Sequence, residues 1–219
     1  MKRWFLFGLL SLTMVLAHAG EPIRLYKQFM VGTPKAYLQK ALTLEDCSQK
    51  YEQGTLCSSN HSLAGENAEI AFRFLKDRLV SVVLYMPLAD ASKIQKMYYA
   101  LKTQFDLALI EDGQNRFDIL EVSANTFNKS EFTQLIADFE NEAYQRQSIK
   151  YTFISKDEFL SQSRRARNFT DLFKEAPLSM RAVTYSIGRQ NNQVVGTLTF
   201  LVPGITESYL DQNPIVEDF

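Results

Sequence analysis

Residues 68–86 read AEIAFRFLKDRLVSVVLYM and contain two apolar runs separated by a short polar turn at residues 75–78. Alternate positions of the two runs are large and apolar: Ile70, Phe72, Phe74, Val80, Val82, Leu84 and Met86. This period of two around a turn predicts a β-hairpin with one strongly apolar face. Such a face must be covered by helices or by a second sheet, so the hairpin is expected to form the centre of the fold.

The first nineteen residues have the three parts of a secretory signal peptide. Lys2 and Arg3 precede an apolar run over residues 4–16, and Ala17-His18-Ala19 is a small-residue cleavage signal. A membrane anchor would need about 20 continuous apolar residues, and polar Glu21 follows too soon. We expect cleavage near Ala19 and a periplasmic or secreted product. The junction has no cysteine, so we expect no lipid anchor and no membrane span.

The charge and histidine content narrow the classes of function. Removal of residues 1–19 takes away two basic residues and no carboxylate, so the formal net charge changes from −1 to −3. A weakly acidic protein has no general field that attracts nucleic acid or anionic membranes, and we expect neither as a partner. The same cleavage removes Trp4 and His18 and leaves His61 as the single histidine.

Cys47 and Cys57 are the two cysteines of the chain and lie in a polar stretch that we expect to be a loop. An even pair in an oxidising compartment predicts a disulfide. A redox-active pair would normally be spaced C-x-x-C, and a zinc site would need two more ligands nearby. We therefore expect a structural disulfide, with no metal and no cofactor.

Turn signals and helical periodicity predict the remaining elements. Helices are expected after Thr33, Asp90 and Asn128, with a fourth helical segment over 156–174 that is broken near Asn168. Hairpins are expected over 107–122 and 181–202, a short strand over 149–154, and a loosely held tail after Gly204. The pattern predicts an α+β fold in which amphipathic helices pack on one face of antiparallel sheets built from hairpins. The chain divides into lobes 20–122 and 123–219, or forms one continuous domain.

The helix expected after Asp90 has Met97, Tyr98 and Leu101 on one face, with Tyr99 next to them. Methionine with adjacent tyrosines can line a ligand groove. Residues at this spacing more often pack in a core, which is the interpretation that we favour.

Residues 31–105 combine a helix start, V-G-T-P-K-A-Y-L, with two cysteines, a Leu63-Ala64-Gly65 turn and the central hairpin. This order resembles small uncharacterised bacterial periplasmic domains. The helix start is also similar to that of the small lipoprotein of the outer-membrane barrel-assembly machinery. That lipoprotein's pattern implies a lipidated cysteine and a Gly-x-Pro after the first helices, and this chain has neither. The resemblance covers about a third of the chain and implies a binding or assembly role.

Candidate catalytic groups are few. His61 lies in a polar stretch without the G-x-S-x-G elbow of a serine hydrolase. Carboxylate pairs, as used by glycosidases, occur at turns and helix starts, where acidic residues are favoured in any protein; they are Glu66 with Glu69, Glu111 with Asp112, and Asp157 with Glu158. No H-E-x-x-H, calcium loop or phosphate-binding loop is present in the sequence. We expect a protein that is not an enzyme.

Arg164, Arg165 and Arg167 form one charge cluster, which we expect on the fourth helical segment. Guanidinium groups suit an acidic partner, a lipid head group or a phosphorylated glycan. The alternative, which we favour, is a solvated face balanced by nearby acids, including Asp171 four residues after Arg167.

Together these features favour a non-catalytic periplasmic protein that binds another envelope protein. An inhibitor or immunity-type factor fits a disulfide-bonded, mildly acidic chain with ten tyrosines, because tyrosine is enriched in interfaces. The alternatives are an envelope assembly or chaperone factor, a carrier of an apolar small ligand, and, third, a hydrolase that uses carboxylates.

Overall fold

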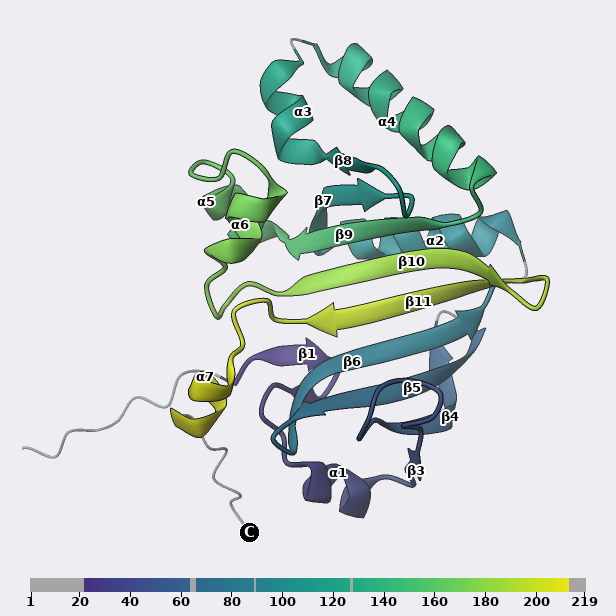
Figure 1. Ribbon diagram of the computed structural model, residues 1–219, viewed down its shortest axis with the longest axis vertical. Helices are drawn as coiled ribbons and strands as arrows, with labels where there is room; N and C mark the ends of the chain where they lie inside the picture. Colours follow the sequence, from purple (N-terminus) through teal and green to yellow (C-terminus); the bar gives the residue numbers. More distant parts are fainter. Residues whose placement is uncertain (1–21, 64–65, 89, 127, 213–219) are drawn as a thin grey trace, which may run out of the picture.

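The computed structural model describes residues 22–63, 66–88, 90–126 and 128–212 (Figure 1). Its strands are β1 (Arg24–Tyr26), β2 (Phe29–Met30), β3 (Glu45–Asp46), β4 (Leu56–Leu63), β5 (Glu66–Leu75), β6 (Arg78–Pro87), β7 (Phe105–Glu111), β8 (Arg116–Asp118), β9 (Ile149–Ser155), β10 (Ala182–Gln190) and β11 (Gln193–Leu201). Its helices are α1 (Lys35–Ala41), α2 (Ala91–Lys102), α3 (Ile119–Asn125), α4 (Lys129–Gln145), α5 (Lys156–Gln162), α6 (Phe169–Lys174) and α7 (Glu207–Gln212). The signal peptide predicted over residues 1–19 lies outside the described residues.

Nine of the strands form one antiparallel sheet in the order β3-β4-β5-β6-β11-β10-β9-β7-β8, and β1 and β2 form a separate pair. The predicted α+β fold with an antiparallel sheet is confirmed. The sheet includes strands from both of the expected lobes, because β6 pairs with β11 in its middle. In that pairing Leu84 lies opposite Leu198 and Val82 lies opposite Phe200.

The central hairpin is confirmed as β5 and β6, and most of its alternating residues are buried. Ile70, Phe72 and Val82 are fully buried. A bulge between Arg73 and Phe74 changes the register near the turn. As a result Leu79 is buried in place of the expected Val80, because the extra residue reverses which side chains face the core.

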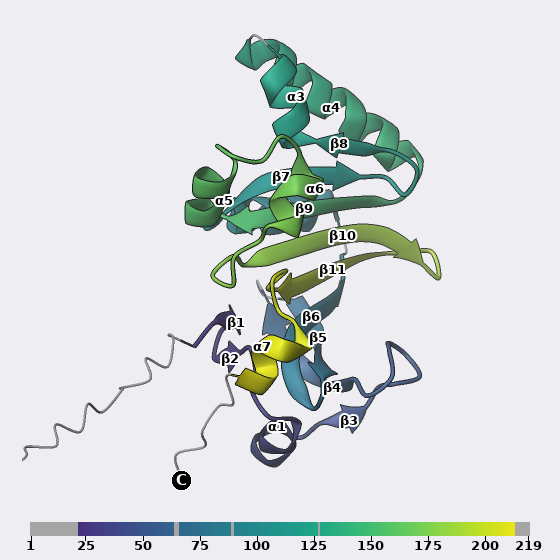
Figure 2. The same cartoon turned by 60° about the vertical axis from the view of Figure 1, so that its left-hand side comes forward.

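Both faces of the sheet are partly covered. Met97 and Leu101 of α2 pack with the large residues of one face in the main core. On the opposite face Ile154 and Ala182 pack against Leu172 of α6 in a second core. Figure 2 shows α6 in front of β9, with α5 beside it, whereas α2 lies behind the sheet in Figure 1.

The disulfide between Cys47 and Cys57 is confirmed, with the two Cα atoms 5.9 Å apart. The residues that it closes cover the remaining part of this opposite face, where Cys57, Ala71 and Val83 are buried together. A disulfide is typical of extracytoplasmic proteins, so the bond is compatible with export.

Several local predictions are wrong. The loop predicted after Cys57 is strand β4, which pairs with β5. The hairpin predicted over 107–122 stops at Asp118, whose carboxylate accepts hydrogen bonds from the backbone of Leu120 and Glu121 and starts α3. The tail predicted to be loose includes α7, where Leu210 is buried and Lys76 forms salt bridges with Glu207 (3.1 Å) and Asp211 (3.0 Å).

Candidate functional site

Helix α4 is amphipathic, but its apolar stripe is only half-buried. The helix starts where the Asn128 side chain accepts a hydrogen bond from the backbone of Glu131 at 2.8 Å. Only Ala143 of the stripe is buried, and Leu135 is 39% exposed. The stripe consists of Phe132, Leu135, Ile136, Phe139 and Ala143. Phe132 and Phe139 pack against the core, where both contact the ring of Phe117, at 6.4 and 5.6 Å between ring centroids. An amphipathic helix normally buries this face, so α4 has apolar surface to offer.

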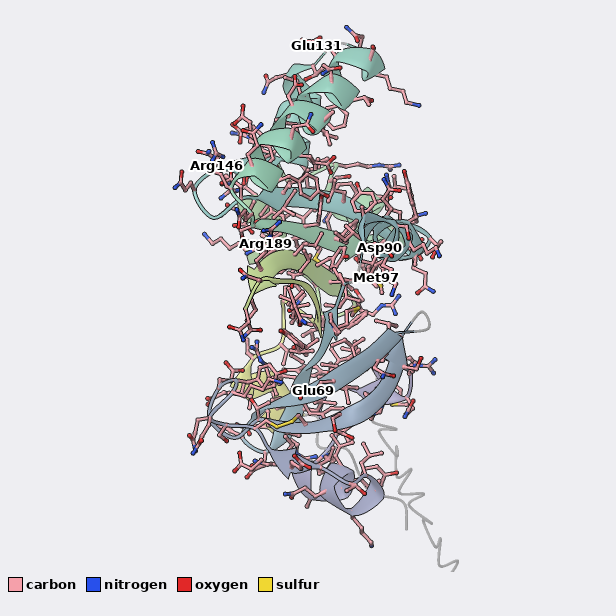
Figure 3. All side chains as sticks on the ribbon, turned by 90° about the vertical axis from the view of Figure 1, so that its right-hand side faces the viewer. Glu69, Asp90, Met97, Glu131, Arg146 and Arg189 are labelled. Atoms are coloured by element: carbon pink, nitrogen blue, oxygen red, sulfur yellow. A yellow bond between two sulfur atoms is a disulfide. The ribbon has the colours of Figure 1, made fainter. Side chains whose placement is uncertain are left out.

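A hollow of about 530 Å³ lies between α4 and α2, with β9 beside it. Its lining includes Ile94, Tyr98 and Tyr99 of α2, Phe132 and Tyr144 of α4, and Tyr151 of β9. We call it the tyrosine groove. In Figure 3, Glu131 and Arg146 mark the two ends of α4 and Asp90 marks the start of α2.

The four tyrosines of the groove form two layers. Tyr98 and Tyr151 are the inner pair, with ring centroids 5.1 Å apart, and Tyr98 also contacts Tyr99 at 5.8 Å. Tyr99 and Tyr144 are the outer pair, 64% and 46% exposed. The hydroxyl oxygens of Tyr144 and Tyr151 lie 3.3 Å apart. Rigid aromatic side chains with one wet end are typical of binding surfaces, because they contribute a large area and lose little conformational entropy.

Burial changes the ionisation of the groups around the groove. Burial raises the pKa of the Glu140 carboxyl, while a hydrogen bond with Tyr151 and the charge of Lys102 lower it. Burial also raises the pKa of the Tyr98 and Tyr151 hydroxyls, so both remain neutral phenols in the physiological range.

The ionisable groups that line the groove are one carboxyl group, two lysines and four tyrosines. Glu140 is the one carboxyl group among the described residues that line it, and no histidine or serine accompanies it. Lysine and tyrosine side chains, which can also transfer protons, complete its ionisable lining. No group of three His, Cys, Asp or Glu among the residues that the structure describes could hold a metal ion.

The arginine cluster lies elsewhere, and its predicted position on a helix is wrong. Residues 163–168 connect α5 and α6 without a helix. The Asn168 side chain accepts a hydrogen bond from the backbone of Asp171 (2.9 Å), and α6 starts there as a separate helix. Arg164, Arg165 and Arg167 are all exposed. Within the described ranges no salt bridge joins them to an acid, including Asp171, and none of them lines the tyrosine groove.

The predicted catalytic candidates are not brought together. His61 lies half-buried in β4, where burial and the charge of Lys27 lower its pKa. Glu69 accepts hydrogen bonds from Lys50 (2.7 Å) and from the Tyr51 hydroxyl. Glu111 forms a salt bridge with Lys150 at 2.6 Å.

Asp112 is likewise held by its neighbours. It is buried, bonded to the backbone of Gln114 (2.8 Å) and Asn115 (2.6 Å), and paired with Arg146. The hydrogen bond from the Asn115 backbone is the main reason why its pKa is lowered. These carboxylates therefore fix turns and strands.

The sequence signal for the tyrosine groove is the pair of adjacent tyrosines in α2, which can line a ligand groove but which we expected to pack in the core. The core does contain Met97 and Leu101. Tyr98, however, is only partly buried, and Tyr99 is exposed. That Tyr151 of β9 meets them is a tertiary contact that periodicity cannot predict.

The chain matches no protein-family model, no curated protein and no solved structure. In the part of the chain that the structure describes, the helices are too short or too polar to cross a membrane.

Proposed function

We propose that this protein is a non-catalytic binding protein of the periplasm that contacts another envelope protein through the tyrosine groove. The observation that carries the proposal is the half-buried apolar stripe of α4 beside the exposed rings of Tyr99 and Tyr144. Exposed apolar surface next to anchored aromatic rings is where protein interfaces have their most important contacts. An inhibitor or immunity-type factor needs such a surface and no reactive group.

The compartment rests on two features of the chain. The sequence of residues 1–19 has the pattern of a cleaved export signal, and the Cys47–Cys57 disulfide is a bond that an oxidising compartment maintains. A periplasmic partner is therefore the one that the groove would meet.

An assembly or chaperone-like factor would use the same surface. It differs in binding several partners weakly where an inhibitor binds one partner tightly. The number of partners that depend on the groove separates the two roles.

A carrier for an apolar small ligand is the second candidate, and the volume of the hollow favours it. The 530 Å³ space lies within the range of about 300–1,000 Å³ that small-molecule sites occupy. Such sites normally enclose most of the ligand, whereas Tyr99 and Tyr144 are largely exposed at the rim. This exposure favours a protein surface.

The test compares two sets of exposed tyrosines. Tyr99→Ala with Tyr144→Ala removes the outer layer of the groove, and Tyr37→Ala removes a tyrosine of α1 that is 54% exposed and lies at the other end of the sheet. We expect the double variant to lose about tenfold or more of its binding to a stoichiometric partner captured from periplasmic extract, because interface tyrosines often contribute more than 1 kcal/mol each. Tyr37→Ala should bind as the wild type does.

Two results would contradict the proposal. Equal capture by the wild type and the groove variant would exclude the groove as the contact surface. Native mass spectrometry that finds a bound lipid, lost in the groove variant, with no groove-dependent protein partner would favour the carrier. Thermal unfolding of each variant checks that the fold is kept, as expected for exposed side chains.

A further inference from the structure

Basic side chains line the tyrosine groove. Helix α2 contains three lysines, Lys93, Lys96 and Lys102, and no carboxylate, and Lys102 is the one of the three that lines the groove. Lys102 lies over the ring of Tyr98, with its Nζ atom 5.5 Å from the ring centroid. A lysine that lines a groove gives it a local positive charge.

The opposite wall adds one lysine and one carboxyl group to the lining. The positions of α4 that line the groove recur at helical spacing and include Lys129 and Glu140. Glu140 is the one acid of this lining, and burial disfavours its charged form. The other acids of α4, Glu131, Asp138 and Glu142, are exposed and do not line the hollow.

The basic character continues beyond Tyr144. A second hollow of about 140 Å³ shares Ile94 and Tyr144 with the groove and is lined by Arg189 of β10. Figure 3 shows Arg189 below the Arg146 end of α4. Within the described ranges, no salt bridge involves Lys102, Lys129 or Arg189. Arg146, by contrast, is paired with Asp112 and Glu142.

We infer that the groove takes an acidic amphipathic segment of the partner protein. Its apolar side chains pack against the tyrosines and the stripe of α4, and its carboxylates face Lys102, Lys129 and Arg189. The 17 residues of α4 give the groove a length of about 25 Å at 1.5 Å per residue, which suits a helix laid between two helices. This inference rests on the proposed function and adds the charge of the partner.

The probe is a synthetic amphipathic peptide about four helical turns long, with leucine and phenylalanine on one face and glutamate on the rest. A second peptide of the same design has lysine in place of glutamate. We expect the mature protein to bind the glutamate peptide at low salt, measured by fluorescence anisotropy. Binding should weaken as salt rises because exposed charges are screened, and the lysine peptide should bind at least tenfold more weakly.

Charge reversal gives the matched test on the protein. Lys102→Glu and Arg189→Glu should each weaken the glutamate peptide about fivefold to tenfold, since an attraction is replaced by a repulsion. Lys40→Glu, on the exposed last turn of α1, changes the net charge equally but lies outside the groove. It should leave the affinity within about twofold.

Equal binding of the two peptides, or equal effects of Lys102→Glu and Lys40→Glu, would overturn the inference. The natural partner then separates the two levels of argument. If its capture depends on Tyr99 and Tyr144 but not on Lys102, the partner is not acidic and the proposed function stands. If its capture depends on none of them, the proposed function fails as well.

Discussion

The two ends of the nine-stranded sheet are stabilised in different ways. At the β3 to β6 end, a short loop closed by the Cys47–Cys57 disulfide covers Ala71 and Val83. At the β10 to β8 end, helices cover the strands, with α2 on one face and α5 and α6 on the other. The first end has a covalent bond in addition to packed residues such as Phe29, whose ring contacts Phe72, whereas the second end is held by packing.

The difference explains where the candidate site lies. At the disulfide-bonded end, Cys47 and Tyr51 of the closed loop pack directly against Cys57, Ala71 and Val83. At the helical end, α4 lies at the edge of the molecule (Figure 1), and its apolar stripe is only half-buried. The tyrosine groove is the result of this incomplete packing.

The largest expected effect tests this difference within the helical end. Phe153 of β9 is 0% exposed, whereas Phe132 of α4 is only partly buried. Phe153→Ala should reduce the free energy of unfolding by about 3–5 kcal/mol, the usual cost of removing a buried phenylalanine. Phe132→Ala should reduce it by about 1 kcal/mol or less, because its ring is in part already solvated. Urea denaturation measures both.

If the two phenylalanine variants lose equal stability, α4 is a full part of the core and the comparison fails. A smaller loss for Phe132→Ala, together with weaker partner capture, would assign this side chain to binding.

The second-largest expected effect concerns the disulfide-bonded end of the sheet. Cys47 and Cys57 are ten residues apart, and a loop of this size contributes about 3 kcal/mol in the chain-entropy model. Cys47→Ala with Cys57→Ala should reduce the free energy of unfolding by about that amount. Partner capture at a temperature where the variant is folded should not change, because the loop lies outside the tyrosine groove. Loss of binding by the folded variant would mean that the contact surface lies at the β3 to β6 end of the sheet and not in the tyrosine groove.

The smallest effect concerns Glu140. The folded state raises the pKa of this carboxyl, so its contribution to stability is fully present below the pKa of the unfolded chain, about 4.3, and is lost as pH rises through the folded-state value. Glu140→Gln should therefore be nearly neutral at low pH and stabilising at neutral pH. Unfolding measured across this range checks the sign.

Glu45→Gln, at an exposed position of β3, is the matched control for the same substitution outside the groove. A Glu140→Gln variant that loses stability at neutral pH would mean that the charged carboxylate is held favourably in the groove.

Much of the fold could be predicted because its signals are local. The hairpin of β5 and β6 has alternating residues and a polar turn, and Asp90 and Asn128 each cap a helix that begins where predicted. The segment after Asp118 was predicted as a strand because its residues are apolar. The segment is a helix because the Asp118 carboxylate caps the start of α3. The same carboxylate also accepts a hydrogen bond from the backbone of Phe169 at 2.7 Å.

The candidate site depends on contacts that are distant in sequence. The sequence of α2 cannot indicate that Tyr151 of β9 lies against Tyr98, and the apolar stripe of α4 predicts an amphipathic helix that packs this face on a core. The tertiary arrangement shows that the stripe is only half-buried. For the arginine cluster, the exposure of the side chains agrees with the interpretation that we favoured, whereas their position in a turn does not agree with the helix that we expected.

The pairing of β6 with β11 has a consequence for the order of folding. β6 reads RLVSVVLYMP and has one charged residue, yet its second neighbour becomes available only when the chain has been extended as far as Leu201. Until then β6 is an unprotected edge, and contacts of such long sequence separation form slowly. A chain of this topology therefore benefits from remaining unfolded until β11 is available to pair with β6.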